Sequence, residues 1–235
     1  MSIITLTTDL GLKDYYVASV KGAILSQFPG ASVVDISHNI SKFDIIQAAF
    51  IIANSYREFP DGTIHIIGVL PDKTKETQHI ALFCDKQYFI GADNGIFPLI
   101  FEKAPEKIVE ISFANENNSL TFPVKDIFVK AACHLASGGK IETLGNIKIE
   151  LFKRTGYIPV VTENCIRGTA VYIDDFGNVF VNVNIRLFNE VGKGRKFALS
   201  FRKGGHPIKT ISSNFYSVPP GEKLAVFNSN GCLEI

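Results

Sequence analysis

Apolar, β-branched runs alternate with stretches of helical spacing along the first part of the chain, and this alternation limits the possible folds more than any other feature. The strand-like runs are 3–8, 32–36, 63–69, 79–84 and 88–92. The helix-like stretches are 15–28, 44–56 and 126–136. Because strands and helices that alternate in sequence build parallel sheets covered by helices, residues 1–150 are predicted to form an α/β domain with a mostly parallel sheet.

The pattern changes after about Gly145. Residues 147–166, with Pro159 and mixed charge, have the composition of a linker. From Arg167 onward we expect only short strands separated by Gly and Pro, with no helical period; they are 169–173, 179–184, 196–201 and 223–227. Short strands without helices are typical of small all-β domains. Residues 151–235 are therefore expected to form this linker and a small C-terminal antiparallel β-barrel.

Composition and charge exclude several classes of protein. Hydrophobic residues make up 46% of the 235 residues and charged residues 20%, which is an ordinary globular balance. The formal net charge is +1 with no block of like charges, so we expect neither a nucleic-acid partner nor a basic membrane patch. Because the chain has no signal-peptide pattern and no apolar stretch of about 18 residues, we expect a cytoplasmic protein that does not span a membrane.

Several motifs of metal and cofactor chemistry are absent. The cysteines are far apart in sequence with no Cys-x-x-Cys pair, so we expect free thiols and no zinc; they are Cys84, Cys133, Cys165 and Cys232. The sequence has no HExxH, no G-x-G-x-x-G, no P-loop and no G-x-S-x-G. We therefore predict no metal and no cofactor.

Carboxylates follow the first predicted strand, in the segment TTDLGLKDYY at 7–16. Asp9 stands just before a Leu-Gly turn at the strand end, where a carboxylate is well placed to accept hydrogen bonds from the hydroxyls of a polar ligand. Asp14 stands before the first predicted helix, so it could instead cap that helix or favour its dipole. Both are candidate binding residues, and we add Phe43, which precedes the second helix.

A second group of candidates lies in the C-terminal part. The segment DDFGN at 174–178 places Asp174, Phe176 and Asn178 in a turn, although such a sequence also suits a plain hairpin. Tyr216 precedes a Val-Pro-Pro-Gly stretch, and its ring could stack on a nucleobase or pack in a core. Ser229 and Asn230 lie in a polar turn near the chain end.

His38 follows the second predicted strand, and the charged segment 70–77 follows the third. A histidine in such a turn could act as a general acid or base, or it could order the loop by hydrogen bonding. Loops at the ends of central strands often carry active sites in α/β sheets, but charged residues there are also compatible with a solvated loop. Both questions stay open on the residues alone.

Taken together, these motifs resemble the S-adenosyl-L-methionine (SAM) hydroxide adenosyltransferase family, which also includes the SAM-dependent fluorinase and chlorinase. The resemblance covers nearly the whole chain. It rests on Asp-x-Gly-x-x-Asp at 9–14, Asp-x-Ser-His at 35–38, Asp-Asn-Gly at 93–95, Asp-Ile-Phe at 126–128, Ala-Cys-His-Leu-Ala at 132–136, Asp-x-Phe-Gly-Asn at 174–178 and Asn-Ser-x-Gly-x-Leu-Glu-Ile at 228–235. Each motif is short, but their joint order and spacing are specific.

The resemblance implies an α/β domain followed by a β-barrel, in a homotrimer that binds SAM between domains of neighbouring subunits. It implies that Asp9 holds the ribose hydroxyls and that the 174–178 turn holds the methionine part and the neighbouring base. The turn with Ser229 and Asn230 is expected near the amino-acid end. In the family, water or halide displaces methionine at the ribose C5′, so SAM or adenosine is the expected small-molecule partner.

The chain departs from the family at the three positions of its Asp-Arg-His triad, where it has Leu70, Thr77 and Pro123. Activating water needs a positioned base, which these residues cannot supply. Three nearby groups could substitute, and they are Asp72, His79 and Lys125. No catalytic residue is therefore assigned. The candidate functions are weak or altered SAM hydrolysis, a non-catalytic SAM- or adenosine-binding module, and a structural trimer with a decayed pocket.

Overall fold

The computed structural model describes residues 2–101, 103–112, 121–154, 156–202 and 204–235. The chain divides into two compact units, Met1–Arg154 and Thr155–Ile235. Each unit has its own sheet and its own hydrophobic core. The two are therefore described separately.

The first unit is built on a seven-stranded sheet in the order β2-β1-β3-β5-β4-β6-β7. Its strands are β1 (Ser2–Thr8), β2 (Ala31–Ser37), β3 (Ile64–Gly68), β4 (His79–Cys84), β5 (Gln87–Ala92), β6 (Lys107–Ile111) and β7 (Gly145–Ile147). Strand β1 pairs in parallel with β2 and β3, and β3 pairs in parallel with β5. Strands β4, β6 and β7 extend the sheet with antiparallel pairs.

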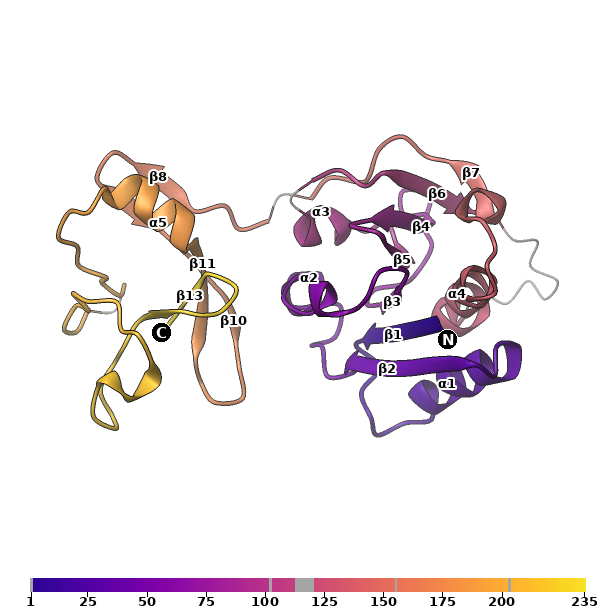
Figure 1. Cartoon of the computed structure of the whole chain (residues 1–235), viewed down its shortest axis with the longest axis horizontal. Helices are drawn as coiled ribbons and strands as arrows, with labels where there is room; N and C mark the ends of the chain where they lie inside the picture. The colour runs from indigo at the N-terminus through magenta and orange to yellow at the C-terminus, as the bar shows by residue number, and fades with distance from the viewer. Residues whose placement is uncertain (1, 102, 113–120, 155, 203) are drawn as a thin grey trace. The chain divides into compact units, whose positions relative to one another are not determined.

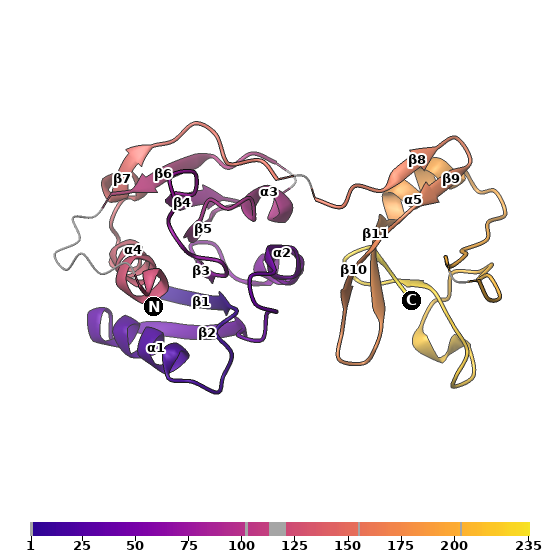
Figure 2. The ribbon, with the colours of Figure 1, turned by 180° about the vertical axis from the view of Figure 1, so that it is seen from behind.

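Helices cover both faces of this sheet (Figure 1). The helical elements are α1 (Tyr16–Gln27), α2 (Ile45–Ala53), η1 (Tyr56–Glu58), α3 (Phe97–Ile100), η2 (Val124–Phe128), α4 (Val129–Ala136) and η3 (Ile141–Leu144). Helices α1 and α4 share one buried cluster with the sheet, and α2 and α3 share the other. Figure 2 shows the same arrangement from behind. With apolar layers on both faces, β1 and β3 are buried along most of their length, as their continuous apolar runs predict.

The sequence predicts this unit well. All five predicted strands and all three predicted helices form within a few residues of their expected bounds. The sequence reasoning missed the strands β6 and β7, the short helix α3 and the 3-10 turns η1 and η3. It also merged two elements, because residues 126–136 begin inside the π-helix η2 and continue as α4.

The second unit contains a four-stranded antiparallel sheet in the order β10-β11-β13-β12. Its strands are β10 (Ala170–Ile173), β11 (Val179–Asn184), β12 (Val226–Phe227) and β13 (Cys232–Glu234). A separate hairpin joins β8 (Val160–Thr162) and β9 (Cys165–Arg167), inside the stretch that we expected to be only a linker. A small antiparallel sheet is thus confirmed, and its outer strands β10 and β12 each pair with one neighbour among the described residues.

Two expectations for this unit are wrong. The helix α5 (Ile185–Gly192) forms where no helix was expected, because the Asn184 side chain accepts from Leu187 N and caps it. The expected strand 196–201 is not a strand; the structure has only an isolated bridge between Leu199 and Ile208 there. The core of this unit is small, centred on Val183, Ile208, Ala225 and Leu233.

Within the ranges that the structure describes, none of the helices combines the length and hydrophobicity that crossing a bilayer requires. Residues Phe215–Ser217 add a short 3-10 turn, η4.

Candidate functional site

The carboxyl ends of the parallel strands carry most of the candidate residues of the first unit. At this edge, the loop after β1 is tied to the loop after β2, since Gly11 N donates to His38 O at 2.8 Å. The same two segments also meet through side chains, because Thr8 Oγ1 and His38 Nδ1 lie 2.7 Å apart. His38 Nε2 lies 3.0 Å from Asp35 Oδ1, outside hydrogen-bond alignment. His38 is buried between these groups, which favours the loop-ordering role over acid–base chemistry.

Asp9 is the candidate that the fold places best for binding. Its side chain follows β1 directly and the residue is only 6% exposed. One carboxylate oxygen, Oδ2, accepts a hydrogen bond from Phe43 N at 2.9 Å, and the Asp9 carbonyl accepts one from Lys42 Nζ. A carboxylate has about four lone-pair positions, so Asp9 keeps acceptor capacity beyond this bond. The structure thus brings Asp9 and Phe43 together.

Asp14 does not cap the first helix. Helix α1 begins after Tyr15, and no side chain caps its N-terminus. Asp14 itself is exposed in the loop before the helix. By contrast, an aspartate does cap helix α2, where Asp44 Oδ1 accepts from Ile46 N and Gln47 N at 3.1 and 3.0 Å.

Two non-glycine residues at this edge have left-handed backbone conformations. Phe43, after β2, has φ of 64°, and Leu70, after β3, has φ of 46°. Other such residues have ordinary reasons, since Asp85 and Lys86 form a hairpin turn and Lys193 ends α5. Bulky residues adopt this conformation at a cost, and such strain clusters at binding and catalytic sites. The Phe43 ring is 63% exposed, so it is available to a ligand.

The loops after β3 and β5 are joined by Asn94. Its Nδ2 donates to Val69 O at 3.1 Å and to Leu70 O at 3.0 Å, and its Oδ1 accepts from Ile96 N at 3.2 Å. The neighbouring carboxylate, Asp93, is fully buried and binds Lys148 and Phe152 N. The Asp-Asn-Gly motif therefore has a structural role at the same edge.

Close packing at Gly68 brings the segments that contain Leu70 and Pro123 near this edge. A Cβ on Gly68 would lie 2.8 Å from Val124 Cγ2 and 3.1 Å from Thr8 Cγ2. Val124 follows Pro123 directly, and Leu70 stands two residues after Gly68. The segments that contain Leu70 and Pro123 thus both approach the end of β1.

None of the three possible substitutes is clearly placed as a base. His79 is buried, its Nε2 lies 2.8 Å from Pro71 O, and its ring packs edge-on to Phe128 at 5.0 Å. Burial lowers the pKa of His79, so the ring is neutral at pH 7 and braces the loop after β3. Asp72 is exposed in that loop. Lys125 Nζ lies 3.4 Å from Asp126 Oδ1, where it is paired with a carboxylate.

In the second unit, Asp174 organises its own turn. Its Oδ1 accepts from Phe176 N at 3.0 Å and Asn178 N at 2.9 Å, and its Oδ2 accepts from Asn178 Nδ2 at 3.1 Å. These bonds explain the Asp and Asn of the motif without a ligand. Phe176 is 93% exposed at the tip of the turn, where nothing in this unit packs on it fully.

The other C-terminal candidates lie away from that turn. Ser229 and Asn230 are exposed in the turn between β12 and β13, where Asn228 Oδ1 accepts from Asn230 N at 3.1 Å and Cys232 N at 3.0 Å. Val179, at one end of β11, bonds Ile235, whereas Ile185, just beyond its other end, bonds Gly231. The 174–178 turn and the 228–231 turn therefore lie at opposite ends of β11, about 20 Å apart for a six-residue strand.

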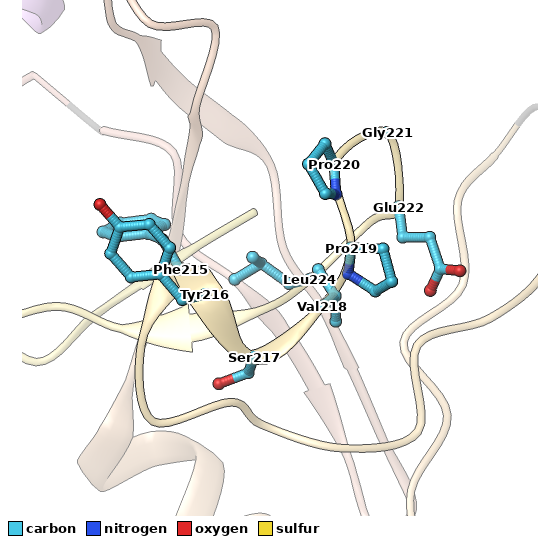
Figure 3. Close-up of a pocket in the computed structure, with 9 residues that line it drawn as sticks. All are labelled: Phe215, Tyr216, Ser217, Val218, Pro219, Pro220, Gly221, Glu222 and Leu224. Carbon is cyan, nitrogen blue, oxygen red and sulfur yellow. The ribbon is translucent and has the colours of Figure 1, made fainter.

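Tyr216 is 97% exposed, so core packing does not explain it. It lines a shallow hollow of about 650 Å³ that is formed by one stretch of chain, residues 215–222 with Leu224 (Figure 3). Proline rings and aromatic side chains make much of its wall, and Glu222 is its charged residue (Figure 3). The hollow contains none of the other candidate residues.

Sequence reasoning missed the role of Lys42 and the contacts of Asn94 and Asp93. Lys42 could have been suspected because it precedes Phe43 in the loop after β2, at the same edge as Asp9. The connections of Asp93 had no sequence signal, since its partners stand 55 and 59 residues later.

The fold and the edge residues define a class: an α/β protein with a buried carboxylate and strained loops at the carboxyl ends of parallel strands, where such sheets bind polar ligands. Comparison with known proteins makes this specific. Residues 4–145 match the model of the SAM hydroxide adenosyltransferase N-terminal domain, and residues 168–235 match that of its C-terminal domain. The chain belongs to the SAM hydroxide adenosyltransferase family, which confirms the predicted resemblance.

Individual relatives agree with this membership. The (R)-S-adenosyl-L-methionine hydrolase of Methanocaldococcus jannaschii is 30% identical, with 100% of this chain and 88% of that protein covered. The protein of the same name from Thermus thermophilus is 28% identical, with 97% and 89% covered. The crystal structure of an uncharacterized conserved protein from Thermotoga maritima superposes with a TM-score of 0.87 at 30% identity, covering 99% of this chain and 90% of that one.

Proposed function

We propose that this protein binds SAM or an adenosyl product at the carboxyl edge of the parallel strands, and that it hydrolyses SAM to adenosine and methionine slowly or with altered chemistry. The observation that carries the proposal is the buried Asp9 carboxylate, which is held by Phe43 N and retains acceptor capacity. Two hydroxyls of a ribose are suitable donors to such a carboxylate. The names of the relatives support SAM as the substrate class.

Slow hydrolysis is proposed because Leu70, Thr77 and Pro123 replace the acid, base and cation expected of an active family member. A positioned general base is worth about 10²- to 10⁴-fold in rate. Some turnover is still expected, because the sulfonium is a good leaving group and an aligned, desolvated nucleophile already gains rate. The left-handed backbone at Leu70 suits aspartate better than leucine, so the loop retains a shape that could accept the acid.

The alternative is a non-catalytic module that binds SAM or adenosine. It is favoured by His79, a possible substitute for the missing base, which is buried and engaged with Pro71 O. The two functions share the binding site and differ only in turnover.

Binding is tested by calorimetric titration of adenosine and of SAM into the protein and its Asp9→Asn variant. Each charge-assisted bond contributes about 1.5–3 kcal/mol, so the variant should bind at least about tenfold more weakly. Asp61→Asn is the matched control, since Asp61 forms an exposed pair with Lys86 at 3.1 Å near the amino end of β3. Equal affinity of Asp9→Asn and the parent would remove Asp9 from the site.

Catalysis is tested by following adenosine and methionine release from SAM by chromatography, with chloride present and absent. We expect turnover about 10²- to 10⁴-fold below that of the M. jannaschii hydrolase assayed alongside. The triple variant Leu70→Asp, Thr77→Arg, Pro123→His should be faster than the parent, whereas single changes should do little because a triad acts as a unit. Parental turnover equal to that of the relative would contradict slow hydrolysis. Adenosine binding with no turnover, even in the triple variant, would favour the module.

We also propose that the protein is a homotrimer, since candidate residues occur on both units and the family is expected to bind its ligand between subunits. Sedimentation equilibrium at micromolar concentration should give a mass near three times 25.8 kDa. A monomer under these conditions would contradict the proposal.

A further inference from the structure

Asp93, at the carboxyl end of β5, is the most deeply buried carboxylate of the candidate edge, with no exposed surface. Its Oδ2 pairs with Lys148 Nζ, and both carboxylate oxygens accept from Phe152 N, at 3.0 and 3.1 Å. Both partners belong to the segment Lys148–Arg154, which we call the connector because it ends the first unit. A buried carboxylate is stable only when such partners compensate its desolvation.

Gly95 extends this contact along the connector. It has φ of 95°, and a Cβ at this position would lie 2.5 Å from Arg154 Cβ. Glycine is therefore required on two grounds, the backbone conformation and the close approach of the Arg154 side chain. At the start of the connector, Lys148 N donates to Ile108 O at 2.9 Å, so both ends of the segment are held against the first unit.

The same turn holds the loop that carries the first substituted triad position. Asn94, between Asp93 and Gly95, donates to Val69 O and Leu70 O. The turn 93–95 thus bonds the connector on one side and the loop after β3 on the other. A buried ion pair contributes little net stability compared with apolar packing, but it requires one arrangement of its partners.

We propose that Asp93 is a positioning residue that fixes the connector to the carboxyl edge of the parallel strands, next to the loop after β3 that carries Leu70. The expected effect of Asp93 on ligand binding rests on the function proposed above, whereas its expected effect on the connector is independent of that function. Asp93 acts through Lys148 and Phe152, and it contacts no ligand in this role.

Hydrogen exchange with mass spectrometry on the full chain tests whether Asp93 holds the connector in place. In Asp93→Ala, exchange of peptides spanning 149–154 should be at least about tenfold faster, because Phe152 N loses its acceptor, while β1 and β3 stay protected. Lys148→Met removes the ion pair but keeps Asp93, so it gives an answer even where Asp93→Ala does not fold. Asp61→Ala, at an exposed pair, should leave exchange at 149–154 unchanged. Unchanged exchange at 149–154 in both Asp93→Ala and Lys148→Met would overturn the proposal.

Ligand binding is then measured on the same proteins with adenosine and SAM. We expect Asp93→Ala and Lys148→Met to weaken binding by about 3- to 10-fold, with Asp93→Glu restoring part of it, while the thermal unfolding of the first unit changes less than in a core variant. A loosened connector with parental affinity would overturn the positioning role. A parental protein that binds neither compound would refute the proposed function, while the exchange data would still decide whether Asp93 holds the connector.

Discussion

Acidification should destabilise the first unit through one buried histidine, His65 on β3. The residue is 1% exposed and stacks on Phe89 with ring centroids 4.6 Å apart. Its Nε2 lies 2.5 Å from Gln87 Oε1, and its Nδ1 lies 2.7 Å from Thr5 Oγ1. Since Gln87 uses its amide nitrogen on Tyr56 O and Phe59 O, its oxygen accepts from His65 Nε2, and Nδ1 accepts from the Thr5 hydroxyl. A second proton would go to Nδ1, and the Thr5 hydroxyl would then have to accept from His65 where it now donates.

The expected loss of stability follows from the shift in the pKa of His65. Burial lowers the pKa of His65 from 6.5 to about 4, and the bond to Gln87 offsets only part of that. The unfolded chain therefore binds a proton below pH 6.5 that the folded protein does not bind until about pH 4. Stability from this group is present above pH 6.5 and is lost as the pH falls through this window. Between pH 7 and pH 5 the loss is about 2 kcal/mol of unfolding free energy.

Urea unfolding of the parent and of His65→Asn, at pH 7, 6 and 5, measures the pH-dependent contribution of His65 to the unfolding free energy. The variant loses packing at every pH, but its amide does not titrate, so its unfolding free energy should fall by about 2 kcal/mol less than that of the parent between pH 7 and pH 5. Taking the difference between the two proteins cancels the carboxylates and the other histidines. Parallel pH profiles would show that His65 titrates alike in the folded and unfolded states, which would contradict the lowered pKa of His65 in the folded protein.

Three further changes test the local structure. Asp174→Ala should lower the unfolding free energy of the second unit by about 1–3 kcal/mol in urea, because three hydrogen bonds of its turn are lost; a loss of adenosine affinity without a loss of stability would instead indicate a ligand role. Gly22→Ala, in the exposed middle of α1 with no atom within 4 Å of a new Cβ, should raise the stability of the first unit by about 0.5–1 kcal/mol, seen as a higher melting temperature. Gly145→Ala should do the opposite, since its Cβ would collide with Glu110 O and separate β7 from β6; a normal melting temperature would contradict that pairing.

The first unit was predictable because its strands are buried on both faces. Continuous apolar runs such as 3–8 and 63–69 have few other interpretations, and the turns after them contain Gly and Pro. The second unit was harder to predict because its core is small and its strands are short. Helix α5 has no long apolar period; its signals are local, namely the Asn184 cap and the Arg186–Glu190 pair, whose side-chain atoms lie 3.2 Å apart. Residues 196–201 have strand propensity, but the structure offers them one bridge and no ladder.

The candidate site was predicted in part, for a related reason. Asp9 could be found because strand ends of parallel sheets meet at one edge, which is a property of the fold class. The pairing of Asp9 with Phe43 N depends on a left-handed residue in the loop after β2, and no sequence pattern specifies that conformation for phenylalanine. The partners of Asp93 were not predictable, since they arise where a distant segment returns to the sheet.

The number of hydrogen bonds that each carboxylate already makes distinguishes residues with a structural role from residues that are candidates for ligand binding. Asp174 accepts three hydrogen bonds within its own turn, and Asp93 binds an ammonium group and a backbone amide. Both residues would be retained by a protein that had lost its ligand, because the backbone depends on them. Among the described residues, the Asp9 carboxylate accepts one hydrogen bond, although it is as inaccessible to bulk water as many core residues. Burying a charge with so few partners costs free energy that a ribose could offset. Asp9, rather than the more complete motifs at 93–95 and 174–178, is therefore the residue whose substitution best distinguishes a working adenosyl pocket from a decayed one.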